Sequence, residues 1–401
     1  MTGTNAFSHT IANGAWKRRV SLSAPVTPGD PPVTPPPAII RPTGAGYVRY
    51  EDLYVTGDTL QQVFQKVSGV HAGKVLTFPA GEFTWSNFKS PIGYHDGIRI
   101  PTTCRGVAGS GIDQTRFRMV PMSSTESIYD STTSGVNPLW MWFIDNVTNP
   151  LFQDFTFVGT EQGHHYNGLG IDHGPGAIVQ RVKFYGANRG YANYPPGETF
   201  SLGLNHCNNP QVIDVECDNR DEITGARVAC SGVGFNNLSA PVVKRTFCHH
   251  GLSGMLTFWN ITGGVTTEDV HTWSQGTNGG VLSSCGINHE NVTGPVRHTR
   301  PKLIIAGRFS EQKLTEDNGQ HLGFGNSFAD MTDCEIYDPV FDRNEHPSGC
   351  MSVMISDGYP TQKIVTMPKV YFNGVLAQVK DRNNLGSMTG ITPSNAWIRY
   401  H

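Results

Sequence analysis

The residues best suited to chemistry in this sequence are aspartates and histidines that recur at regular intervals. Asp172 and His173 lie in GIDHGPGAIVQRVKFYG (170–186), and Asp145 lies in FIDNVTNPLFQDFTFVG (143–159), 27 residues earlier. Carboxylates in adjacent strands would be about 5 Å apart. Such a pair binds a cation or raises one pKa, and this separation also matches the carboxylate pair of a retaining glycosidase. Asp145 and Asp172 are therefore weak candidates for catalysis and for calcium binding.

The two stretches belong to a repeated frame of seventeen residues. The frame also fits GLNHCNNPQVIDVECDN and GFNNLSAPVVKRTFCHH, with looser copies near Phe258 and Gly286, at offsets of 27, 33, 31, 24 and 28 residues. The third position is always Asp or Asn, at Asp145, Asp172, Asn205, Asn236, Asn260 and Asn288. Asparagine has no useful proton to give or take, so this column favours a structural ladder of side-chain hydrogen bonds over a catalytic site.

Histidines form a second column, because His173, His206 and His289 each follow the ladder residue. Zinc needs three or four converging ligands, and one histidine per repeat makes such convergence awkward. The sequence therefore favours surface or ladder histidines and no metal site. Other frame positions predict a core: the tenth is Phe or Val, and the fifteenth holds Phe157, Phe184, Cys217 and Cys248.

The repeats predict a parallel β-helix. Only 16% of the 401 residues are charged, and there are 46 glycines, which suits strands and turns. Repeats of 24–33 residues with apolar alternation lack the 3.6-residue period of helical repeats. They are also shorter than the ~40–45 residues of a propeller blade. Stacked units of this kind bury a continuous core.

Other segments define the organisation of the chain. In DTLQQVFQKVSG (58–69), apolar residues recur at helical spacing and Asp58 or Thr59 can cap, so a short helix is expected there. Residues 25–42 carry eight prolines and predict an extended linker. We therefore expect an attachment peptide (1–24), a Pro-rich linker (25–46), a β-helix domain (47–378) and a C-terminal cap or tail (379–401).

The sequence resembles right-handed parallel β-helix proteins of the pectin-lyase-like group, which includes polysaccharide lyases, glycoside hydrolases and bacteriophage tailspikes. The resemblance covers residues ~50 to ~375 and rests on the cap helix with GKVLTFPAGEFTW, the coil GVAGSGIDQTRFRM and the repeated Ile-Asp/Asn frame. The Pro-rich leader ahead of the β-helix resembles a phage minor tail or tailspike-like protein. The Asp172-His173 segment is similar to the calcium-binding WIDH segment of pectate lyases, but the arginines that accompany that segment have no clear match.

The resemblance implies a virion tail component, assembled in the host cytoplasm, that presents a rigid β-helix to the host cell surface. It also implies a homotrimer, docking on other tail proteins through residues 1–24, and host glycan as a ligand. The alternative is a polysaccharide lyase or glycoside hydrolase on the same scaffold. With a net charge of −3, no globally basic surface argues for nucleic acid. No apolar run resembles a signal peptide or a membrane span. No cofactor is expected, with calcium the one possibility.

Residues in the insertions between strands are the expected ligand face, because carbohydrate sites combine aromatic rings with carboxylates and amides. The candidate glycan contacts are His164, His165, Tyr185, Tyr191, Tyr194, His249 and His250. The further catalytic candidates are Glu198, Asp221 and Glu222. Eight cysteines without any CxxC pair predict free, buried thiols.

Overall fold

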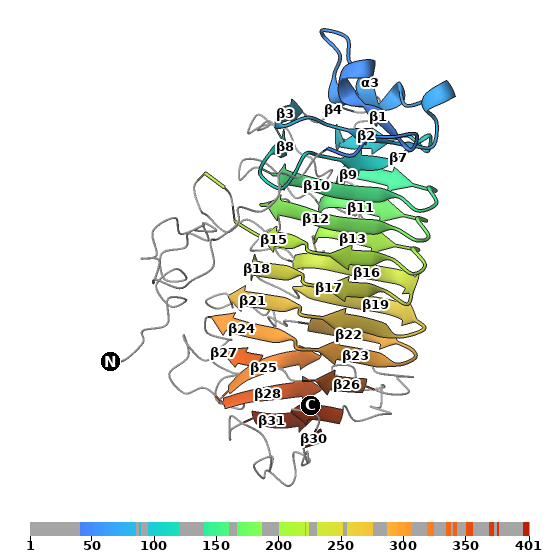
Figure 1. Cartoon of the computed structure of the whole chain (residues 1–401). Coiled ribbons are helices and arrows are strands. Elements are labelled where there is room, and N and C mark those ends of the chain that lie inside the picture. Colours follow the sequence, from blue (N-terminus) through green and yellow to red (C-terminus); the bar gives the residue numbers. More distant parts are fainter. Residues whose placement is uncertain are drawn as a thin grey trace, which may run out of the picture. The chain divides into compact units, whose positions relative to one another are not determined.

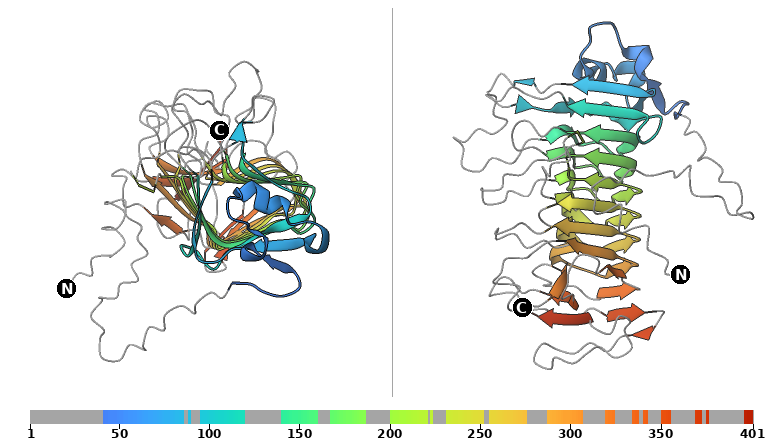
Figure 2. Two further views of the ribbon diagram at one scale, coloured as in Figure 1. Left: turned by 90° about the horizontal axis from the view of Figure 1, so that it is seen from above. Right: turned by 90° about the vertical axis from the view of Figure 1, so that its left-hand side faces the viewer.

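The computed structural model confirms a parallel β-helix and describes most of the chain from residue 41 onward. The described residues are 41–85, 88–89, 95–119, 140–159, 167–186, 200–220, 222–223, 231–251, 255–275, 287–306, 319–324, 334–337, 340–342, 350–355, 369–372, 375–376 and 396–400. The predicted attachment peptide and most of the predicted linker lie outside them. Successive coils lie on one another along the stack (Figure 1), and they superimpose when viewed from its end (Figure 2).

Three faces of parallel strands surround one core. The first face is built from β6 (Ile98–Ile100), β9 (Trp140–Asp145), β11 (Asn167–Asp172), β13 (Phe200–Asn205), β16 (Ser231–Ser239), β19 (Leu256–Thr262) and β22 (Ile287–Val292). The second face holds β1 (Tyr47–Arg49), β2 (Lys74–Thr77), β7 (Cys104–Ala108), the first halves of β10 (Leu151–Val158) and β12 (Ile178–Tyr185), then β14 (Gln211–Ile213), β17 (Val242–Lys244), β20 (Val265–Glu268), β23 (Val296–Thr299), β26 (Cys334–Tyr337) and β29 (Lys369–Phe372).

The third face completes each coil. It is built from β3 (Gly81–Trp85), β8 (Thr115–Met119), the second halves of β10 and β12, then β15 (Glu216–Asp218), β18 (Phe247–Gly251), β21 (His271–Gln275), β24 (Lys302–Ala306) and β27 (Val340–Asp342). Near the C-terminus, β25 (Gly319–Phe324), β28 (Cys350–Ile355) and β31 (Ala396–Tyr400) form a separate parallel sheet. The segment expected as a C-terminal cap therefore contains a strand parallel to its neighbour. Three short strands, β4 (Phe88–Lys89), β5 (His95–Asp96) and β30 (Val375–Leu376), lie in antiparallel pairings.

The core consists of the inward columns that the frame predicted. Phe152, Val179, Val212 and Val243 are fully buried, as are the fifteenth-position residues Phe157, Phe184, Cys217 and Cys248. The described cysteines 104, 207, 217 and 248 are free and buried, and burial raises the pKa of the Cys217 thiol well above its usual value. These thiols are therefore small apolar core residues, as the sequence predicts.

A short helix covers the N-terminal end of this core. Helix α3 (Leu60–Gln65) begins after Thr59, whose hydroxyl accepts from the backbone of Gln62 in a capping box. It carries the fully buried Phe64, whose ring meets that of Trp142 edge-on with 5.5 Å between the ring centroids, a favourable geometry for an aromatic pair. The predicted helix over 58–69 is confirmed, in a shorter form. Helix α2 (Tyr50–Leu53) and a 3-10 turn at Gly69–His71 flank it.

The first corner, between the first and second faces, carries two columns of polar residues. Strand register aligns Asp145, Asp172, Asn205 and Asn236 in successive coils. The next position in each coil adopts a left-handed backbone, with φ between 47° and 55°, at Asn146, His173, His206, Asn237 and Asn260. Asparagine and histidine tolerate this conformation better than most residues, so the turn itself selects these residue types.

The predicted ladder diverges from the strand register after Asn236. Asn236 pairs with Trp259, so Asn260 lies one position later, beside Asn237, whose side-chain oxygen it contacts at 3.1 Å. Asn288 pairs with Thr257. The physical reason is core packing: Phe258, not Trp259, points inward and stacks on Phe235 at 4.9 Å. A repeat aligned on its asparagine alone therefore falls out of register here.

His289 also departs from its expected column. It pairs with Phe258 and is fully buried in the core, where its ring stacks on that phenylalanine at 5.2 Å. It is therefore an interior residue, and the corner column of histidines consists of His173 and His206 among the residues that the structure describes.

The second corner, between the second and third faces, carries a column of alternating charge. Its residues also have left-handed backbones, with φ between 46° and 63°, and they are Asp154, Arg181, Asp214, Arg245, Asp269 and Arg300. Each arginine makes a two-pronged ion pair with the aspartate one coil earlier: Arg181 reaches Asp154 at 2.6 and 2.9 Å, and the later pairs are similar. We call this set the charge column.

Candidate functional site

Besides the charge column, two clusters of titratable residues are candidate sites in the part of the chain that the structure describes. The first, called the corner cluster, consists of Asp145, Asp172, His173 and His206 at the first corner. The second, called the third-face cluster, consists of residues on or directly after β12, β15 and β18, and its members are Lys183, Tyr185, Glu216, Asp218, Arg220, His249 and His250. The sequence-predicted residues His164, His165, Tyr191, Tyr194, Glu198 and Asp221 lie outside the described residues.

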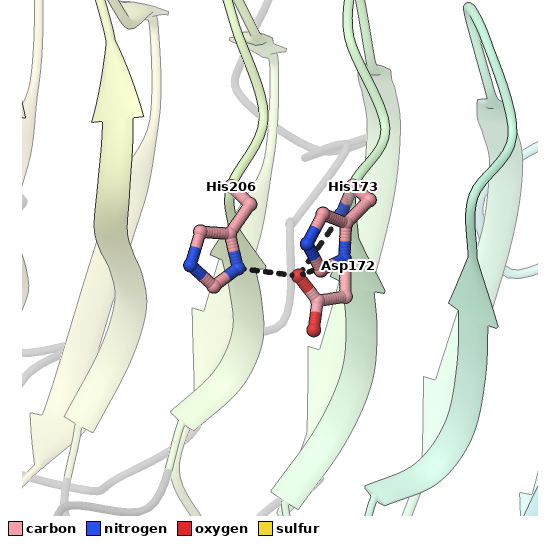
Figure 3. A group of neighbouring side chains, drawn as sticks. All are labelled: Asp172, His173 and His206. Carbon is pink, nitrogen blue, oxygen red and sulfur yellow. Dashed lines mark hydrogen bonds and ion pairs between the residues drawn. The ribbon is translucent and has the colours of Figure 1, made fainter.

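In the corner cluster, one carboxylate oxygen gathers several donors. Oδ1 of Asp172 lies 2.9 Å from Nδ1 of His206 and 3.1 Å from Nδ1 of His173 (Figure 3). The side-chain nitrogen of Asn205 lies 3.1 Å from the same oxygen. This oxygen also accepts from the backbone N–H of His173 at 2.9 Å. The two imidazole rings stack at 4.5 Å.

Asp145 extends the corner cluster by one coil. Its Oδ1 lies 3.1 Å from Nδ1 of His173, and its Oδ2 accepts from the side chain of Asn146 at 2.8 Å. Carboxylate and imidazole thus alternate along the corner over three coils. The sequence favoured no metal site, because one histidine per repeat makes convergence of ligands awkward. In the structure Nδ1 of His173 and Nδ1 of His206 both lie close to the same oxygen of Asp172.

The third-face cluster is a connected network of charges. Strand register places Lys183 beside Glu216, and Tyr185, Asp218 and His249 in one row. Nζ of Lys183 lies 3.3 Å from Oε1 of Glu216 and 4.3 Å from the centre of the Tyr185 ring. The chain thereby holds an aromatic ring and a charged pair side by side on adjacent coils.

The buried end of this network is centred on Asp218. Its carboxylate forms a two-pronged ion pair with Arg220 at 2.9 and 2.7 Å, and His250 Nδ1 lies 3.1 Å from it. His249 joins His250 at 2.7 Å and Glu216 at 3.1 Å. His249 and His250 are buried, at 0% and 3% exposure, so they lie beneath the surface and hold the carboxylates in place.

Electrostatics keep both carboxylates of this network ionised. Burial opposes ionisation of Asp218, but His249, His250 and Arg220 together hold its pKa far below the usual value. Burial likewise opposes ionisation of Glu216, whose pKa is nevertheless lowered by His249 and Lys183. Burial lowers the pKa of His250 to about 4, despite its hydrogen bond to Asp218.

A second set of ion pairs borders the network. Glu222 reaches back to β8, where it accepts from Arg116 at 2.6 Å and from Arg118 at 2.8 Å. Arg118 also binds Glu82. Glu222, predicted as a catalytic candidate, is thus held between two arginines. It is separated from Asp145 and Asp172, which lie at the first corner.

Sequence reasoning overlooked Lys183, Glu216, Arg116 and Arg118. A signal was present at the fourteenth frame position, which holds Lys183 and then Glu216 in consecutive coils. Because strand residues alternate sides, that position points outward beside the inward fifteenth. Opposite charges one coil apart therefore indicate a surface ion pair.

No protein-family model matches the chain, and no curated protein matches its sequence. Solved structures that are similar include PfbA, a surface adhesin of Streptococcus pneumoniae, at 8% identity over 88% of this chain and 92% of that one, with a TM-score of 0.44. They also include the catalytic domain of a GH87 alpha-1,3-glucanase in complex with nigerose, at 9% identity over 85% and 66%, with a TM-score of 0.39.

A third similar structure is tailspike protein 3 of bacteriophage CBA120, at 12% identity over 85% of this chain and 64% of that one, with a TM-score of 0.21. The similar structures thus include an adhesin, a glycan-processing enzyme and a phage tailspike. Within the described part of the chain, no helix is both long and apolar enough to cross a membrane.

Proposed function

We propose that this protein is a bacteriophage tail component, of the minor tail or tailspike-like kind, whose β-helix binds a glycan of the host envelope on its third face. In this proposal residues 1–24 dock the chain on another tail protein, and the protein acts as a homotrimer in the virion. The observation that carries the glycan-binding part is the third-face cluster with its bordering ion pairs.

The chemistry of this surface suits a sugar. Tyr185 offers a half-buried aromatic ring, and in the cluster and its bordering ion pairs Glu216, Arg116 and Glu222 each keep 19–28% of the side chain exposed. Sugars are bound by aromatic rings together with polar groups fixed in position. Here ion pairs fix the polar groups before any ligand arrives, which lowers the entropy cost of binding.

The same electrostatics favour binding over hydrolysis. A hydrolase with a carboxylate pair needs one carboxyl group that stays protonated near neutral pH, which requires a raised pKa. On the described part of this face, the resolved pKa shifts of Glu82, Glu216 and Asp218 are all downward. Of these carboxylates Glu216 and Glu82 are partly exposed, so in this proposal they accept hydrogen bonds from sugar hydroxyls, while the buried Asp218 holds its neighbours in place.

The test is binding of the purified full chain to an array of bacterial surface polysaccharides, with Tyr185→Ala compared against Tyr54→Ala. Tyr54 is an exposed tyrosine (39%) near the N-terminal helices and serves as the matched control. We expect Tyr185→Ala to weaken binding about tenfold or more, because a ring that stacks on a ligand contributes about 1–3 kcal/mol. Tyr54→Ala should bind like the wild type.

Two outcomes would contradict the proposal. Binding that falls equally in both variants, or binding to no polysaccharide, would remove glycan recognition from the third face. Release of oligosaccharides that disappears in Glu216→Gln or Asp218→Asn would show the enzyme alternative, a lyase or hydrolase, to be correct.

A further inference from the structure

The corner cluster has the composition of a transition-metal site. Oδ1 of Asp172, Nδ1 of His173 and Nδ1 of His206 all lie within 4.8 Å of one another. Two imidazole nitrogens with one or two carboxylate oxygens form a donor set that zinc and similar first-row ions favour. Calcium prefers six to eight oxygen ligands, which this mixed set does not offer.

We propose that Asp172, His173 and His206 bind one zinc-like divalent ion at the first corner. The ion would join two successive coils. This site is separate from the third-face cluster and does not depend on the proposed glycan binding.

The distances between the donor atoms fit a shared ion. Ligands placed about 2.1 Å from a tetrahedral zinc ion are about 3.4 Å apart. The contacts from Oδ1 of Asp172 to Nδ1 of His206 and to Nδ1 of His173 are 2.9 and 3.1 Å. The carboxylate oxygen and each nitrogen therefore need to separate by only a few tenths of an ångström to admit the ion.

The imidazole rings must also turn. They are nearly parallel, with 15° between their planes, and an ion cannot lie in two parallel ring planes that are stacked. Both side chains are about half exposed, at 52% and 43%, so rotation about the bond to the ring meets little packing. The left-handed turn fixes the backbone while leaving this rotation free.

The chain itself provides variants that remove the ligands and keep the turn. Asparagine occupies the same left-handed position in neighbouring coils, at Asn146 and Asn237. His173→Asn and His206→Asn therefore delete an imidazole without straining the backbone. His271→Asn is the matched control, because His271 is an exposed histidine on the third face.

The experiment is calorimetric titration of the chelator-treated full chain with zinc chloride, repeated with calcium chloride. We expect one zinc ion to bind at this corner, with affinity about tenfold or more lower in each single variant and lost in the double variant His173→Asn/His206→Asn. His271→Asn should bind zinc as the wild type does. Calcium should give no comparable binding.

Cobalt provides a second readout, because cobalt bound through nitrogen and oxygen at low coordination number absorbs visible light more strongly than the hydrated ion. Zinc should also raise the unfolding temperature of the wild type, since an ion that binds only the folded state stabilises it. The proposal is overturned if the wild type binds no zinc, or if the double variant binds zinc with unchanged affinity and the same cobalt spectrum.

Discussion

The two corners of the β-helix share one backbone conformation but present different kinds of side chain. Both place non-glycine residues at positive φ in successive coils. At the second corner the residues alternate between aspartate and arginine, so every carboxylate has a guanidinium beside it. At the first corner aspartates meet only imidazoles and amides, which leaves donor atoms able to accept an ion. A column whose charges cancel internally stabilises the coil, whereas a column with surplus lone pairs can bind a ligand.

The largest expected effect comes from breaking the most buried pair of the charge column. Asp154 is 1% exposed, and Arg181 is its partner. Arg181→Asn keeps a residue suited to the left-handed turn but leaves a buried carboxylate without its cation. We expect the free energy of unfolding to fall by about 3 kcal/mol, measured by urea denaturation.

Arg245→Asn is the control for this change. Its pair with Asp214 is 51% and 36% exposed, and such pairs contribute about 1 kcal/mol or less. Equal losses in the two variants would show that burial does not distinguish the two pairs.

Histidines also occur in the interior, where burial changes their pKa, in contrast to the exposed histidines of the first corner. Burial lowers the pKa of His298 to about 3, and that of His250 to about 4. The unfolded chain, with a histidine pKa of about 6.5, then binds more protons than the folded chain below that pH, so stability falls as the pH drops. Between pH 7 and pH 5 we expect a loss of about 2 kcal/mol for each of these histidines.

The variant His298→Asn isolates the contribution of one buried histidine to this pH dependence. The asparagine amide can retain the contact that Thr267 makes with Nδ1 of His298, at 2.7 Å, but it does not titrate. We expect the variant to lose about 2 kcal/mol less than the wild type between pH 7 and pH 5. An unchanged pH dependence in urea denaturation would contradict this assignment.

The smallest expected effect comes from exchanging two charges while keeping their pair. The double variant Asp214→Arg/Arg245→Asp preserves that ion pair but sets Arg181 beside an arginine and Asp269 beside an aspartate. We expect a loss of about 1 kcal/mol, because the groups are partly exposed, and this loss should diminish in 1 M salt. A loss that is independent of salt would assign the effect to packing.

The sequence predicts the coils well where the inward apolar residue and the polar corner residue keep the same spacing in each repeat. In four copies of the frame an inward apolar residue precedes each Asp or Asn, and strand register follows it through Asn236. The prediction fails at Asn260 because Phe258, not its apolar neighbour Trp259, takes the interior position beside Phe235, which moves the asparagine by one place. The helix at α3 was predictable because its capping and its apolar spacing are local.

The candidate sites were less predictable. The charge column was visible at the twelfth frame position, which reads Asp, Arg, Asp, Arg in the four strict copies. The corner cluster required the side-chain positions of His173 and His206, because the sequence places both at the turn but does not show that both rings approach Asp172. Composition alone placed His249 and His250 in surface loops, whereas both lie in β18 and are buried, with contacts to Glu216 and Asp218.

The alternation of the charge column has a consequence for how such a domain changes length. Its pattern repeats every two coils, from one aspartate to the next. Loss or duplication of a single coil would bring two arginines or two aspartates together, while loss or duplication of two coils would restore every pair. In this part of the chain, evolution by duplication and engineering by insertion should therefore proceed in pairs of coils.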